Sequence, residues 1–141
     1  VAANYNSPGQ LVISGQEAAT TLACERMKAA GAKRVILLPV SGAFHSPLME
    51  SARFELADAI AITEFKRPKC PIYQNVDAKG NTDVLVIKSN LQAQLTSPVK
   101  WTQCVKQMIN DGATSFYESG PGSVLQGLIR KVNSEMQVNG Y

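Results

Sequence analysis

The feature that most constrains the fold is a segment, Arg34–Val40 (RVILLPV), that is apolar after its first residue and is followed at once by a glycine-containing loop and a helix start. A short apolar run between turn residues is typical of a strand that is buried on both faces. Ser46–Pro47 supplies the helix start, because serine can cap a helix and proline is tolerated at its first position. The pattern therefore predicts a strand, a loop and a helix in succession, as in α/β proteins.

The rest of the chain extends this alternation. The turn residues Ser7-Pro8-Gly9 predict a strand on either side of them, and Gly31 predicts the end of an Ala-rich helix. The expected order is β-β-α-β followed by α-β-α-α-β-α, with a frayed tail from Asn133. We expect a boundary between two subdomains near Val40–His45, and a parallel α/β sheet after it. The expected elements are strands 1–3 and 11–14, helix 17–30, strand 34–40, helix 46–62, strand 71–75, helices 83–95 and 100–110, strand 115–118, and helix 123–132 with Val124, Leu125, Leu128 and Val132 facing inward.

Composition narrows the class of protein. A chain of 141 residues with 45% hydrophobic and 18% charged residues has the length and balance of one globular domain. No apolar run approaches the roughly 20 residues that span a bilayer, and no signal peptide pattern is present. A net charge of +3 is too small to indicate a nucleic-acid partner. Three widely spaced cysteines and one histidine predict reduced thiols in a cytoplasmic protein and no metal site.

His45 is the only histidine, and it lies in the loop between the expected strand and helix. A lone histidine is more often structural, but loops at strand ends are where α/β proteins place reactive groups. Imidazole also exchanges protons near neutral pH. Ser41 has no GxSxG motif around it, and Ser46 is better explained as a helix cap. The residues alone therefore indicate a candidate general base without a credible nucleophile.

Five segments, in order, resemble the malonyl-CoA:acyl-carrier-protein transacylase family of bacterial fatty-acid synthesis: NYNSPGQLVISG, AGAKRVILLPVS, GAFHSPLM, NLQAQLTSPVKWTQCV and ESGPGSVLQGLIRKV. The resemblance runs from Asn4 to Val132 and implies the C-terminal half of the family fold. Residues 1–40 would be part of a ferredoxin-like small subdomain (β-β-α-β), and residues 41–141 the C-terminal part of a large α/β-hydrolase-like subdomain. The sequence contains neither the family's GQGSQ segment nor its GHSLG serine and the arginine that follows. The resemblance thus implies a partner, the missing N-terminal half of the same enzyme, and an inactive chain without it.

The implied reaction is a ping-pong transfer, in which a serine takes malonyl from CoA and passes it to the phosphopantetheine thiol of acyl carrier protein, with no bound cofactor. His45 matches the catalytic histidine. Gln94 matches the residue whose backbone carbonyl orients this histidine, so a side-chain change at Gln94 is expected to do little. Phe44, which on its own would suggest core packing, matches an aromatic residue that accompanies malonyl preference by occluding a methyl branch.

The resemblance implies further contacts with substrate. Asn4, Asn6 and Gln10 match a loop near the pantetheine arm, although amides around a Ser-Pro-Gly turn also satisfy local hydrogen bonds. Lys33 and Arg34 match a basic pair that faces CoA phosphates and the acidic carrier protein, although a solvated charge pair has the same appearance. Two alternatives remain open: a non-catalytic fragment that binds CoA or carrier protein, and a piece of a polyketide synthase acyltransferase domain.

Overall fold

The N-terminal residues form a β-hairpin, as the sequence predicts. In the computed structural model, which describes residues 1–141, β1 (Ala2–Ser7) pairs antiparallel with β2 (Gln10–Ile13). Gly9 takes φ +76° in the turn, a left-handed conformation that glycine adopts without steric cost. β1 is longer than predicted, because its edge also pairs with the segment at Val99: the N–H of Tyr5 donates to the Val99 carbonyl at 2.8 Å.

The helix after the hairpin is confirmed, but the strand expected after it is wrong. α1 (Glu17–Ala29) ends where predicted, at Gly31 with φ +89°. Arg34–Val40 forms no strand, and Ile36 and Leu37 are 55% and 62% exposed. A strand needs a neighbour for its N–H and C=O groups, and no strand of this chain pairs with the run. The order at the N-terminus is therefore β-β-α rather than β-β-α-β.

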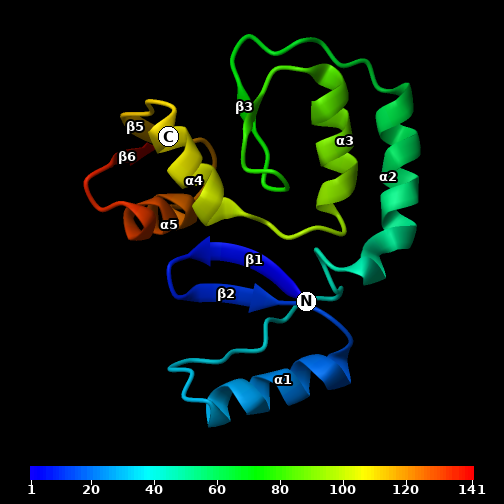
Figure 1. The fold of residues 1–141 in the computed structure, drawn as a ribbon, viewed down its shortest axis with the longest axis vertical. Helices are drawn as coiled ribbons and strands as arrows, with labels where there is room; N and C mark the ends of the chain where they lie inside the picture. The colour runs from blue at the N-terminus through cyan, green and yellow to red at the C-terminus, as the bar shows by residue number, and fades with distance from the viewer.

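The middle of the chain forms two helices that lie side by side, with a small hairpin between them in sequence (Figure 1). Asp83 caps the second helix by accepting from the N–H of Leu85 at 2.7 Å. The hairpin is tight: a Cβ on Gly80 would lie 2.9 Å from the Tyr73 ring, so a larger residue there would require the ring to move. The predicted helices 46–62 and 83–95 and the short strand between them are confirmed. The elements are the 3-10 turn η1 (Pro47–Met49), α2 (Glu50–Ile62), β3 (Ile72–Tyr73), β4 (Gly80–Asn81) and α3 (Val84–Gln94).

The C-terminal residues build a small core of their own. Val105, Ile129 and Val138 are buried together from α4, α5 and β6. The elements are α4 (Trp101–Asn110), β5 (Ser115–Glu118), α5 (Val124–Val132) and β6 (Gln137–Gly140). The prediction of a frayed tail is wrong, because β6 pairs in parallel with β5 along its whole length. This pairing satisfies the backbone groups of the last residues, which the polar sequence after Asn133 does not indicate.

Two further expectations need correction. Val124 and Leu125, expected to face inward, are exposed, and the buried residue of α5 is Ile129. The first turn of α5 instead faces Glu118, whose carboxylate accepts from the N–H groups of Leu125 and Gln126. Nor do the strands after residue 41 join in one parallel sheet, since β3–β4 is antiparallel and only β5–β6 is parallel. The fold is a mixed α/β arrangement in which none of the helices is long and apolar enough to cross a membrane.

Candidate active site

His45 lies in a tight turn just before η1. Its backbone takes φ +59°, a left-handed conformation that residues other than glycine adopt at a cost and that is enriched at functional sites. Ser46 is 1% exposed and holds this turn. Its hydroxyl donates to the Ala43 carbonyl at 2.6 Å and accepts from the N–H of Leu48 at 3.3 Å. The predicted helix cap is confirmed, and the same hydroxyl fixes the turn that carries His45.

The imidazole of His45 reaches the C-terminal end of α3. Its Nδ1 lies 2.9 Å from the backbone carbonyl oxygen of Gln94, 49 residues further along the chain. In a continuing helix this carbonyl would accept from the N–H of residue 98, but residue 98 is a proline and has none. The Gln94 carbonyl therefore has no helical partner and accepts from His45.

This hydrogen bond selects one form of the neutral ring. A carbonyl oxygen can only accept, so the proton is assigned to Nδ1 of His45 and Nε2 is left with a free lone pair. An imidazole held in this tautomer can take a proton from a hydroxyl or thiol at Nε2 and return it later. His45 is only half-buried, so the ring remains accessible. The pair has the chemistry of a general base with its orienting group.

A polar network fixes the helix that supplies the carbonyl. Asp77, between β3 and β4, accepts from the side-chain amides of Asn81 and Asn90, each at 2.9 Å. Gln74 donates to a carbonyl of α3 at 3.0 Å. Burial acts to raise the pKa of Asp77, but the hydrogen bonds from Asn81 and Asn90 outweigh it, and the pKa lies below its usual value. The charged Asp77 therefore ties α3 to the β3–β4 hairpin.

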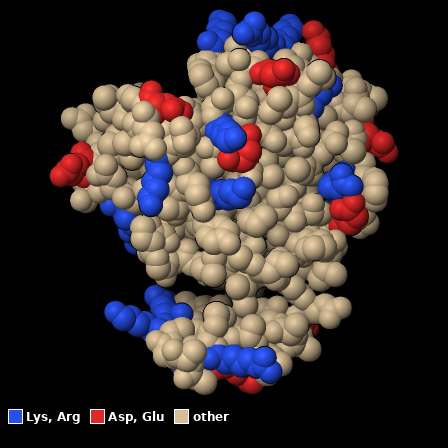
Figure 2. Space-filling model, viewed as in Figure 1, with Lys and Arg blue, Asp and Glu red and all other residues tan.

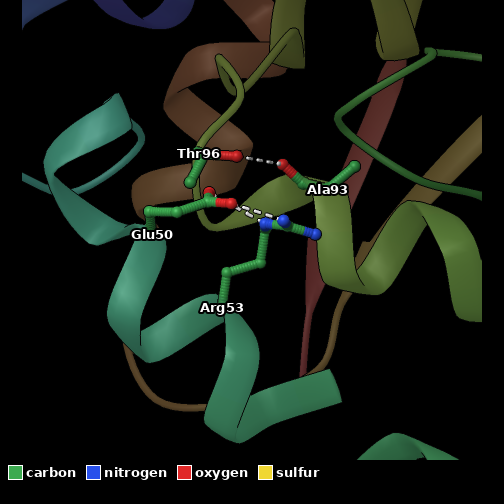
Figure 3. A network of polar contacts seen from close by, with 4 residues as sticks. All are labelled: Glu50, Arg53, Ala93 and Thr96. Carbon is green, nitrogen blue, oxygen red and sulfur yellow. Dashed lines mark hydrogen bonds and ion pairs between the residues drawn. The ribbon is translucent and has the colours of Figure 1, made fainter.

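Figure 3 shows a second set of polar contacts, where α2 meets the end of α3. Arg53 donates from Nε to the Glu50 carboxylate at 2.8 Å, and this hydrogen bond lowers the pKa of Glu50 and raises that of Arg53. Close to this pair, the hydroxyl of Thr96 donates to the Ala93 carbonyl at 3.5 Å. The ion pair is on the surface, where such pairs contribute little to stability, so the packing of α2 on α3 matters more.

Phe44 precedes the histidine and lies on the surface. Its side chain is 46% exposed, so the core-packing alternative is not supported in this chain. The ring covers Gly42, where an added Cβ would come within 3.3 Å of it. Phe44 is therefore held close to the loop beside His45, in contact with Gly42.

Asn4 and Asn6 lie on β1 and are half-buried. The backbone of Asn4 pairs with Val99, five residues after Gln94, so β1 runs beside the turn that follows α3. The structure thus links the first of these two asparagines through the backbone to the segment that orients His45.

The remaining predicted residues are less closely connected to His45. Gln10 opens β2, where its side-chain oxygen accepts from the Ser7 hydroxyl at 3.2 Å and from Lys131 at 3.4 Å. These contacts match the alternative of a locally satisfied turn. Lys33 and Arg34 are exposed after the end of α1, which makes no extensive contact with any other helix or strand.

Two surface hollows lie away from the histidine. One hollow runs along α1 past Glu17 and Glu25, and another lies beside Arg67 and Asp83. Neither is lined by His45. No group of three or more His, Cys, Asp or Glu side chains is placed to hold a metal ion.

Two features of this site are not predicted from the sequence. One is the left-handed backbone of His45. The other is a pair of hydrogen bonds from the Gln94 carboxamide, which donates to the carbonyls of Ser97 at 2.9 Å and Pro98 at 3.4 Å. Pro98, four residues after Gln94, is the sequence signal that indicates a carbonyl without a helical donor.

With this geometry in place, the chain can be compared with known proteins. The model of the acyl transferase domain family matches residues 1–139, and the chain belongs to this family. It is 45% identical over 136 residues to a malonyl CoA-acyl carrier protein transacylase of Staphylococcus aureus (strain COL), covering 96% of this chain and 44% of that protein. It is 44% identical over 135 residues to the Bacillus subtilis transacylase, covering 96% of this chain and 43% of the relative.

A solved structure extends the similarity to three dimensions. An acyl carrier protein S-malonyltransferase from Vibrio cholerae matches with a TM-score of 0.96 and 44% identity, over 100% of this chain and 46% of the other. The described fold is therefore part of that larger fold. The chain spans less than half the length of the curated relatives it matches.

Proposed function

We propose that this chain is the C-terminal half of a malonyl-CoA:acyl-carrier-protein transacylase and supplies its general acid/base, His45. The observation that carries the proposal is the 2.9 Å contact between His45 Nδ1 and the Gln94 carbonyl, which joins two distant segments. A histidine oriented in this way is what an acyl transfer through a nucleophilic oxygen needs. The similarity to named transacylases supplies the substrate class, malonyl-CoA and acyl carrier protein.

In the proposed reaction, Nε2 of His45 takes the proton of a serine hydroxyl as that oxygen attacks the malonyl thioester. The proton then passes to the departing CoA sulfur. In the second half, the carrier-protein thiol gives its proton to His45 and attacks the acyl-serine ester, and His45 returns the proton to the serine oxygen. The Gln94 carbonyl stabilises the imidazolium that forms at each stage.

The serine of this reaction is proposed to lie outside residues 1–141. Ser46 is adjacent to His45 but is buried, and its hydroxyl already donates to the Ala43 carbonyl. Ser46 therefore serves the turn rather than the chemistry. The exposed apolar run at Arg34–Val40 supports the same division, because a strand partner for it would come from the rest of the enzyme. Residues 1–40 and 41–141 would then belong to the small and large subdomains.

The test measures the transfer of radiolabelled malonyl from malonyl-CoA to carrier protein. The enzyme is a complete acyl transferase domain that includes this chain as its C-terminal half. We expect His45→Ala to lower kcat by about 10²–10⁴-fold. Cys70→Ser, an exposed change away from the pair, is the matched control and should leave kcat unchanged. Full activity of His45→Ala would refute the catalytic role. A malonylated 1–141 chain would place the nucleophile inside it.

Phe44 is proposed to set the preference for malonyl over branched acyl groups. Its exposed ring would occupy space that a methyl branch needs. We expect Phe44→Ser to raise the methylmalonyl-to-malonyl ratio of kcat/KM by about tenfold. Phe54→Ser, a change at another exposed phenylalanine, on α2, should leave the ratio unchanged. An unaltered ratio in Phe44→Ser would remove the residue from selectivity.

Lys33 and Arg34 are proposed to attract the CoA phosphates and the acidic carrier protein, with Asn4, Asn6 and Gln10 near the pantetheine arm. A type II polyketide synthase acyl carrier protein has been solved in complex with its malonyl-transacylase, a chain 38% identical to this one with a TM-score of 0.91. Replacing both Lys33 and Arg34 with Gln should raise KM for carrier protein and weaken its salt dependence.

The equally exposed pair Lys66 and Arg67 offers the matched double-Gln control. Both pairs carry the same formal charge, so equal effects at the two pairs would mean that only net charge matters.

A further inference from the structure

The proposed reaction uses only the backbone carbonyl of Gln94, yet the side chain of Gln94 also makes hydrogen bonds. Its carboxamide nitrogen donates to the Ser97 carbonyl at 2.9 Å and to the Pro98 carbonyl at 3.4 Å. These acceptors belong to the turn that leaves α3 and leads to Val99 beside β1. The side chain of Gln94 thus holds the turn that follows α3 against the last residue of the helix.

This closure acts on the backbone of Gln94. The last carbonyls of a helix have no intrahelical donors, and they change direction easily when the following residues move. Here the carboxamide links the end of α3 to the turn, and Pro98 has no N–H that could recapture the Gln94 carbonyl. The carbonyl is left pointing at Nδ1 of His45.

From these contacts we propose that Gln94 is a positioning residue through its side chain: the carboxamide fixes the turn 95–98, the turn fixes the direction of the Gln94 carbonyl, and the carbonyl fixes the tautomer and orientation of His45. The inference rests on the proposed function of His45. It contradicts the expectation that a side-chain change at Gln94 does little.

The first test replaces Gln94 with Met, which keeps the length and shape of the side chain and removes both donors. Gln92→Met is the matched control, because Gln92 is also half-buried on α3 and its carboxamide makes no hydrogen bond within the chain. Both variants are made in a polypeptide with a complete acyl transferase domain. The signals of His45 are assigned by comparison with His45→Gln.

The main readout is the pair of imidazole ¹⁵N chemical shifts of His45, which report the fraction of each tautomer. The parent protein should show protonated Nδ1 and unprotonated Nε2. Gln94→Met should move both shifts toward the average of the two tautomers and lower kcat by about tenfold or more, with KM for malonyl-CoA unchanged. Gln92→Met should match the parent in both measurements.

Gln94→Glu provides a second variant in case the first folds poorly. A carboxylate has no donors and is repelled by the two carbonyls, so the same change in tautomer is expected above the pKa of the new Glu. Unchanged His45 shifts in a folded Gln94→Met or Gln94→Glu variant would overturn the positioning role. If His45→Ala retains activity while the Gln94 variants still shift the ¹⁵N signals, the positioning stands and the catalytic proposal fails, so the two outcomes are distinguishable.

Discussion

Two regions of this chain are stabilised very differently. Residues 101–140 enclose their own core, in which Val105 is 0% exposed and packs with Ile129 and Val138. Residues 17–40 bury little: Cys24 is the one buried residue of α1, and the run after it exposes Ile36, Leu37, Leu38 and Val40. Figure 1 shows α1 apart from the other helices, below the β1–β2 hairpin. Figure 2 shows a notch that separates this part from the rest of the molecule.

The difference shows where each region obtains its stability. A helix and an apolar run that find no partner within 141 residues gain little from burial. The chain matches 46% of a larger solved relative, and under the proposed function the rest of such a fold would cover the exposed apolar run. In residues 101–140 the core is already buried by residues of the same region.

Amide hydrogen exchange should reveal the largest contrast. In the isolated chain, core amides of α4 and α5 should exchange at least about a thousandfold more slowly than those of α1, because local opening of α1 exposes almost no apolar surface. Exchange measured by mass spectrometry on peptides from both regions checks this. Equal protection in α1 and α4 would mean that the two regions unfold as one unit, and the comparison would not hold.

A matched pair of truncations should give the next largest difference. Val105→Ala removes two buried carbon groups and should lower the free energy of unfolding by about 2–3 kcal/mol. Leu22→Ala on α1, where the side chain is exposed, should change it by about 0.5 kcal/mol or less. Denaturant unfolding of the isolated chain measures both, and a large effect of Leu22→Ala there would reveal a contact for α1.

The three cysteines report on the same contrast through their reactivity. Burial raises the pKa of the Cys104 thiol on α4 to about 11, with a smaller contribution from Asp77, so little thiolate forms at pH 8. Cys70 is exposed, and Cys24 is buried on the loosely packed α1. A thiol reagent should therefore modify Cys70 first, Cys24 next and Cys104 last, as followed by peptide mass mapping. Modification of Cys104 before Cys24 would reverse the proposed order of local stability.

The last expected effect is seen only at high pH, as a pH dependence of stability in the C-terminal region. Between the ordinary thiol value of 9.0 and the folded value of about 11, the unfolded chain releases the Cys104 proton while the folded chain retains it. Stability from this group is thus fully present below pH 9 and is lost as the pH rises toward 11. Cys104→Ala should flatten this part of the pH profile of unfolding, whereas Cys70→Ser should not.

Local chemistry in the sequence determined the parts that depend on neighbouring residues. Ser46 starts its helix where a capping residue predicts, the helix expected from Asp83 begins there, and Gly31 ends α1. The segments that resemble the family also led to His45 and Gln94 as a pair. Pro98 has no N–H to donate, and this explains why the Gln94 carbonyl has no helical donor and can accept from His45.

Tertiary structure decided what depends on distant partners. Arg34–Val40 has the composition of a buried strand, but a strand exists only where another strand supplies its hydrogen bonds, and this chain supplies none. The polar tail after Asn133 does the opposite: it becomes β6 because β5 lies beside it. The left-handed turn of His45 and the bonded carboxamide of Gln94 arise in the same way, from contacts that fix backbone direction. Periodicity and capping are local properties of the sequence, whereas pairing and orientation belong to segments that meet only in the folded protein.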